Sequence, residues 1–192
     1  LSATYPAGML RTLPTALGAA ALGALALGAL AAVPAAASTP PGSTTPDPSE
    51  LLDEPGTIVL GTSVEGRPIE AIHRADPDGD GSDAATVVVF GVIHGDEQAG
   101  RDIVARLGDL PLPDDVELYL VESMNPDGMD ADRRTNANLV DLNRNFPYNW
   151  GPIGQPGDWE YAGPSAASEP ETVAVVDFLS TLRPDLVVWY HQ

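Results

Sequence analysis

Short apolar runs separated by polar turns dominate the chain from Leu51 onward. Thr57–Val64 and Pro68–Arg74 flank a Glu65-Gly66 turn, which is typical of a β-hairpin. Thr86–Ile93 is a continuous β-branched run, the pattern of a strand that is buried on both faces. Two further strands are predicted by the remaining runs: Val116–Val121, which is shorter and partly alternating, and Asp185–Tyr190, which again reads as buried.

Two segments between these runs have helical periodicity. The first starts near Glu97 and stops at Gly108, and its apolar face is formed by Ile103, Val104 and Leu107. The second begins at a capping box, Ser168–Glu171, with Pro170 in its first turn, and ends at Pro184. Its buried stripe consists of Val175, Val176, Leu179 and Leu182. Strands alternating with helices predict an α/β layered fold with a mixed, mainly parallel central sheet flanked by helices and a hairpin at one edge.

The first fifty residues differ in composition from this domain. Residues 1–37 have the layout of a secretory signal peptide, with basic Arg11, an Ala/Leu/Gly run and a small-residue end at Ala35–Ala37. Residues 38–50 are rich in Pro, Ser and Thr and predict a flexible linker. We therefore expect a signal peptide region at 1–37, a linker at 38–50, a domain at 51–192 and a secreted, extracellular protein. An uncleaved leader that anchors the chain in the membrane is the alternative.

The composition of the chain limits the classes of ligand and the catalytic groups that it can have. The 192 residues carry 28 acidic and 9 basic side chains, which gives a net charge of −19. Such a sequence offers too few cations to form a surface that binds nucleic acid. With no cysteine, the chain has no disulfide and no thiolate nucleophile. His, Asp and Glu remain as the strong metal ligands, and there are only three His.

Two of these histidines lie directly after predicted strands. His94 and Glu97 follow Thr86–Ile93, and His191 follows Asp185–Tyr190. The carboxyl ends of strands in an open α/β sheet line the ligand crevice, so the three side chains are predicted to meet at one rim. Two imidazoles and one carboxylate form the ligand set of a catalytic zinc site. A surface turn after one strand and a structural histidine after the other are the alternatives.

The irregular segment Glu122–Ala167 adds arginine and asparagine side chains next to this rim. Arg134 and Arg144 supply guanidinium groups suited to bidentate capture of a carboxylate, and Asn143 adds an amide. In an acidic protein this local reversal of charge favours an anionic substrate. The alternative is a solvated loop whose arginines pair with the abundant aspartates.

Several motifs together resemble the zinc carboxypeptidase family over essentially all of Gly56–Gln192. They are His94-Gly-Asp-Glu97, Asn125-Pro-Asp-Gly128, Arg134-x-Asn136, Asp141-Leu-Asn-Arg-Asn-Phe-Pro147 and His191, in that order. The resemblance implies that His94, Glu97 and His191 bind Zn²⁺ and that Arg134 polarises the scissile carbonyl and stabilises the oxyanion. It also implies that Asn143 and Arg144 hold the terminal carboxylate of the substrate.

Within the family, Gly163–Thr172 and Asn136–Pro147 most resemble the murein peptide amidase branch, which cleaves the amide between D-glutamate and diaminopimelate. We therefore expect a zinc-dependent metallopeptidase or amidase that hydrolyses a bond next to a free carboxylate terminus, with peptides or murein peptides as its partners.

The sequence departs from the family pattern in two places. The family has a general-base glutamate on a later strand, and nothing matches it before Gln192. We expect the sequence to be a C-terminally truncated form of a longer enzyme, able to form a zinc site but weakly active or inactive alone. A non-catalytic zinc-containing module that binds cell-wall peptides is the alternative. In addition, Leu139 stands where glycine is expected, and it is strained if that position needs a positive φ.

Two remaining features are assigned no function. His73 lies mid-strand without an acidic partner at ligand spacing and is interpreted as structural. Asp76–Gly81 begins like a calcium-binding loop, but the twelfth position is Val87 rather than a bidentate glutamate, which favours a plain acidic turn.

Overall fold

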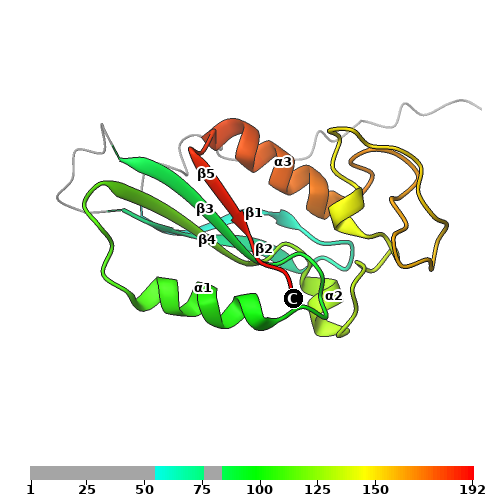
Figure 1. Ribbon diagram of the computed structural model, residues 1–192, viewed down its shortest axis with the longest axis horizontal. Helices are drawn as coiled ribbons and strands as arrows, with labels where there is room; N and C mark the ends of the chain where they lie inside the picture. Colours follow the sequence, from blue (N-terminus) through cyan, green and yellow to red (C-terminus); the bar gives the residue numbers. More distant parts are fainter. Residues whose placement is uncertain (1–54, 76–83) are drawn as a thin grey trace, which may run out of the picture. The chain divides into compact units, whose positions relative to one another are not determined.

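A five-stranded mixed sheet with order β1-β2-β4-β3-β5 forms the centre of the computed structural model, which describes residues 55–75 and 84–192 (Figure 1). β1 (Gly56–Thr62) and β2 (Pro68–Arg74) form the predicted antiparallel hairpin at one edge. β3 (Ala85–Val92) runs parallel to both β4 (Val116–Ser123) and β5 (Leu186–Trp189). The predicted α/β class and the mainly parallel centre are confirmed.

Alternate residues of the central strands point to opposite faces of the sheet and build two cores. Val88 and Phe90 of β3 pack with Phe178 and Val175 of helix α3 (Pro170–Leu182). Val89, between them, packs on the other face with Val104 of helix α1 (Ala99–Asp109). Figure 1 shows α1 and α3 on opposite sides of the sheet. This two-sided burial explains why the run Thr86–Ile93 is apolar at nearly every position.

The predicted end of α1 at Gly108 is wrong, because the helix continues to Asp109. Leu110 then adopts an extended conformation with φ −73° and ψ 148°. Leu110 precedes Pro111, whose ring disfavours the helical conformation of the residue before it. The proline therefore ends the helix, and the glycine is accommodated within it.

Two strand predictions also need correction. β4 extends to Ser123 and is eight residues long, so it is not a short strand. β5 was predicted to be buried, but it lies at an edge of the sheet, and Leu186 is 53% exposed. The strand is apolar because it pairs with β3 and because Trp189 packs on Phe90. The centroids of these two rings are 4.0 Å apart.

The segment Glu122–Ala167 is irregular as predicted except for the last two residues of β4 and two short helices. Helix α2 (Pro126–Asp130) and a 3₁₀ turn, η1 (Leu142–Arg144), lie within it. Asn125 caps α2 by accepting a hydrogen bond from Gly128 N at 3.0 Å, and Asp141 caps η1 by accepting one from Asn143 N at 2.9 Å. Each cap begins a helix of only a few residues. Such helices are too short to be detected from helical periodicity in the sequence.

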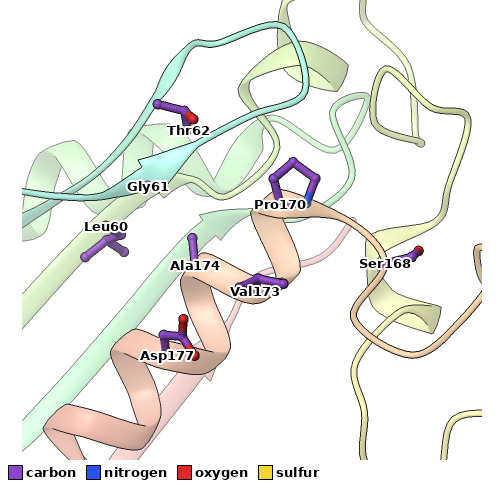
Figure 2. A pocket seen from close by; sticks show the side chains of 8 residues that line it. All are labelled: Leu60, Gly61, Thr62, Ser168, Pro170, Val173, Ala174 and Asp177. Carbon is purple, nitrogen blue, oxygen red and sulfur yellow. The ribbon is translucent and has the colours of Figure 1, made fainter. Parts of the chain in front are cut away.

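Helix α3 starts at Pro170 as expected, but the predicted capping box does not form. Ser168 Oγ instead donates to Glu169 Oε1, and the Glu171 carboxylate accepts from Val64 N in the hairpin turn. Phe178 and Ala174 are buried although the predicted stripe omitted them, whereas Val176, Leu179 and Leu182 are only half-buried. The helix lies so close to β1 that an added Cβ at Gly61 would be 2.7 Å from that of Ala174 (Figure 2).

Several sequence predictions lie outside the described residues: the signal peptide region at 1–37, the linker at 38–50 and the acidic turn at 76–81. Within residues 55–75 and 84–192, no helix is long and apolar enough to cross a membrane.

Candidate metal centre

His94 and Glu97 lie in a tight turn that follows β3. The turn is closed by a hydrogen bond of 3.0 Å from Glu97 N to His94 O. A Cβ at Gly95 would lie 1.9 Å from the carbonyl carbon of Gly128 in α2, so this position has room only for glycine. The turn is thereby held directly against the segment that follows β4.

His191 reaches the same place from the end of β5. Its Nδ1 atom is 2.9 Å from Glu97 Oε2, and Glu97 Oε1 is 2.9 Å from His94 Nδ1. One ligand atom from each of these three residues lies within 4.8 Å of the others. The three side chains are therefore brought together at one rim of the sheet, as the positions of the strand ends predicted. His94 is buried, Glu97 is half-buried and His191 is exposed, so the cluster opens to solvent on one side.

This donor set fits a divalent cation. Nε2 of His94 donates to Asp141 Oδ1 at 3.0 Å, which directs the lone pair of a neutral ring at Nδ1 toward Glu97. Two acceptor atoms 2.9 Å apart need a positive charge between them, supplied by a second proton or by a metal ion. Two imidazoles and a carboxylate are the protein ligands of many catalytic zinc sites.

Asp141 is a functional residue that the sequence analysis missed. It is fully buried, and besides His94 it binds Arg134, whose Nε and Nη2 atoms donate to Oδ2 at 3.1 and 2.8 Å. A carboxylate that orients a metal-binding imidazole is a common partner in such sites. The sequence signal was present in the Asp141–Pro147 motif, but spacing alone did not connect it to His94, 47 residues away.

The carboxylates at this centre are ionised more readily than usual. Burial acts to raise the pKa of Glu97, but the hydrogen bond to His191 and the proximity of His94 outweigh it and lower the pKa. Burial also acts to raise the pKa of Asp141, and hydrogen bonds from His94 and Arg134 bring it below the usual value. Both groups are therefore anionic near neutral pH and available to balance a cation.

Arg134 lies at the centre and is mostly buried. Its Nη1 atom is 3.2 Å from His94 Nδ1 and 3.4 Å from Glu97 Oε1. Its main-chain oxygen accepts from Asn125 Nδ2, which also donates to Ile93 O, so one buried asparagine ties the end of β3 to the arginine segment. This explains the Asn125 motif in structural terms.

Asn143 and Arg144 occupy η1, immediately after Asp141. Arg144 Nη2 donates to Glu160 Oε1 at 2.6 Å, and Asn143 is exposed. Both line a small hollow of about 140 Å³ with Phe146, Tyr148 and Ile153. The alternative, in which the arginines pair with acidic residues, is thus partly realised: Arg134 pairs with Asp141 and Glu97, and Arg144 pairs with Glu160.

Leu139 and His73 agree with their sequence interpretations, with one correction. Leu139 has φ 62°, the strained left-handed conformation expected if glycine is the favoured residue. His73 is buried in β2, but it does have an acidic partner, since Nε2 is 2.8 Å from Glu117 Oε1 on β4.

Known proteins resemble this chain in sequence and in fold. The family model described as zinc carboxypeptidase matches residues 111–192. Carboxypeptidase SOL1 from Arabidopsis thaliana is 32% identical over 136 residues, which cover 65% of this chain and 26% of the relative. The crystal structure of the murein-tripeptide amidase MpaA from Escherichia coli O157 is 31% identical, with a TM-score of 0.59, over 72% of this chain and 61% of the amidase.

The chain is similar to the zinc carboxypeptidase family in sequence and in fold. The crystal structure of carboxypeptidase A from Helicoverpa armigera is also similar, with 25% identity and a TM-score of 0.61 over 75% of this chain and 42% of that one. The chain spans less than two thirds of the length of each of these relatives.

Proposed function

We propose that this chain is a member of the zinc carboxypeptidase family that binds one Zn²⁺ through His94, Glu97 and His191 and acts on peptide or amide bonds next to a free carboxylate. The observation that carries the proposal is the convergence of the three ligand atoms within 4.8 Å. A bound zinc ion supplies Lewis acidity toward a carbonyl group.

The remaining roles follow from the side chains of the chain itself. Asp141 fixes the ring of His94 and holds Arg134 beside the cluster. The buried guanidinium of Arg134 is placed to stabilise negative charge on a carbonyl oxygen, because its charge is little screened by water. We assign Asn143 and Arg144 to the carboxylate of the substrate, since both line one hollow after η1.

Murein peptides are the proposed substrates, with the amide between D-glutamate and diaminopimelate as the bond cleaved. The support is the likeness to the murein-tripeptide amidase together with the Asn136–Pro147 and Gly163–Thr172 sequences. Export through residues 1–37 is proposed from the leader sequence and would place the chain outside the cytoplasm, where such peptides occur.

A zinc-containing module that binds peptides without hydrolysing them is the second candidate. In the described part of the chain, the carboxylates that contact His94, Arg134 or His191 are those of Glu97 and Asp141. Both are already engaged, so neither is available as the general base that takes a proton from water.

The test begins with metal content. The purified chain should retain about one zinc ion, and His94→Ala or His191→Ala should abolish retention, because each removes one of three ligands. Arg144→Ala should retain zinc, since it leaves the ligand set intact. Zinc retained by His94→Ala, or absent from the unaltered chain, would overturn the metal assignment.

Turnover separates the two candidates. The zinc-loaded chain is incubated with the tripeptide L-Ala-γ-D-Glu-diaminopimelate, and released diaminopimelate is measured by chromatography. Release that disappears in His191→Ala supports the amidase. Binding of the tripeptide by calorimetry without release supports the binding module.

A further inference from the structure

Trp159 and Glu160, adjacent in the segment between η1 and α3, each contact a different arginine of the proposed site. The Trp159 ring lies 4.9 Å from Cζ of Arg134, within the range of a cation–π contact. Glu160 Oε1 accepts from Arg144 Nη2 at 2.6 Å. Two consecutive side chains therefore cover the group assigned to the carbonyl oxygen and the group assigned to the substrate carboxylate.

These residues belong to a short loop that is closed at its base, residues 153–162, which we call the strap. Ala162 N donates to Ile153 O at 3.0 Å, and Tyr161 N donates to Asp158 O at 3.2 Å. Gly154 and Gly157 have φ values of 64° and 95°, so the strap turns at positions that favour glycine. These hydrogen bonds keep the strap closed, and Trp159 and Glu160 contact the two arginines outside it.

The Trp159 ring and the Arg144–Glu160 ion pair are open to solvent, whereas Arg134 is mostly buried. Trp159 is 66% exposed, and the side chains of Arg144 and Glu160 are 30% and 50% exposed. Exposed ion pairs contribute little stability, because water screens them and ordering the side chains costs entropy. The carboxylate on Arg144 is thus held weakly enough to exchange with another carboxylate.

We propose that Glu160 is an internal carboxylate that occupies Arg144 in the free protein, and that a carboxylate-bearing ligand binds by displacing it and moving Trp159 from Arg134. The proposal rests on the proposed function, because it takes Arg144 as the group that holds the ligand carboxylate. Glu160 Oε1 occupies Nη2 of Arg144, the donor that a ligand carboxylate would need for a bidentate pairing, so the two carboxylates compete for it.

The test removes the internal competitor. Glu160→Gln should bind N-acetyl-Ala-Ala about two- to five-fold more tightly than the unaltered zinc-loaded chain, measured by calorimetry, because the ligand no longer competes with an exposed ion pair. The C-terminal amide N-acetyl-Ala-Ala-NH₂ should show no such gain. Glu122→Gln is the matched control: Glu122 Oε1 pairs with Arg101 Nε at 2.6 Å and a similar exposure, and it should leave the affinity unchanged.

Tryptophan emission tests the movement of the strap. Saturating N-acetyl-Ala-Ala should change the emission of the unaltered chain by removing the cation from the Trp159 ring, and this change should disappear in Trp159→Phe. An emission change of equal size in Trp159→Phe would overturn the part of the proposal that concerns Trp159.

Two outcomes distinguish this proposal from the proposed function. Equal or weaker affinity in Glu160→Gln, with binding lost in Arg144→Gln, would overturn displacement and leave the carboxylate site in place. If Arg144→Gln binds N-acetyl-Ala-Ala as well as the unaltered chain, the carboxylate assignment is wrong and displacement is overturned with it.

Discussion

Asp141 Oδ1 lies 3.0 Å from Nε2 of His94, on the side of the ring opposite the Nδ1 atom that faces Glu97. The aspartate therefore fixes both the tautomer and the direction of the imidazole before any cation binds. Since Asp141 also anchors Arg134, a single buried carboxylate positions a metal ligand and the proposed electrostatic group.

Asp141→Asn is expected to weaken zinc binding about 10- to 100-fold, because the imidazole loses an anionic partner. Zinc affinity is measured by competition with a chelator of known affinity. Asp127→Asn is the control: Asp127 is also buried, but it binds Ser63, Arg67 and the backbone of Glu65, so its loss should lower stability and leave zinc affinity unchanged. An unaltered zinc affinity in Asp141→Asn would contradict the orienting role.

Gly95→Ala is expected to lower the free energy of unfolding by about 1–3 kcal/mol and to weaken zinc retention. The added Cβ would overlap the backbone of Gly128, so the turn that carries His94 and Glu97 must move. Gly151→Ala, where a Cβ meets nothing within 4 Å, should change stability by less than about 0.5 kcal/mol in the same urea titration. Similar stabilities for the two variants would show that the turn tolerates displacement.

Leu139→Gly is expected to raise the free energy of unfolding by about 0.5–1 kcal/mol. Glycine relieves the cost of a left-handed leucine at φ 62°, and the gain is reduced by the greater freedom of glycine in the unfolded chain. Leu110→Gly provides the comparison, because Leu110 is also exposed but has φ −73°. The Leu110→Gly variant should be less stable than the unaltered chain. A loss of stability in both glycine variants would argue against strain at Leu139.

Glu171 is expected to make stability fall as the pH rises from about 5 toward neutrality. Burial raises the pKa of this fully buried carboxyl, and the neighbouring Glu169 raises it further, while hydrogen bonds from Val64 N and Asn136 act against them. A pKa that is raised on folding contributes stability that is present below the unfolded value of 4.5 and lost as the pH passes the folded value. The pKa values of Asp127 and Asp141 are lowered, so their contributions are lost only in stronger acid.

Urea unfolding of Glu171→Gln between about pH 5 and neutrality isolates this contribution. The variant has no titrating group at position 171, so its stability should depend less on pH than that of the unaltered chain. Equal slopes would show that other acidic groups cause the dependence.

The sequence predicted most of the elements because each strand and helix has its own periodicity. The continuous apolar run of β3 and the Pro170 start of α3 are local signals, and both appear as expected. Local signals failed where a neighbour decided the outcome. Ser168 bonds to Glu169 rather than capping the helix.

The sequence by itself determined which residue types could bind a metal, because without cysteine and with three histidines few combinations remain. The strand-end rule then placed His94, Glu97 and His191 at one rim. Only the tertiary structure revealed the Asp141–His94 pair and the contacts of Trp159 and Glu160 with Arg134 and Arg144. Such contacts join residues whose separation along the chain follows no period, so they depend on how irregular loops fold back over the sheet, which hydrophobic patterning does not encode.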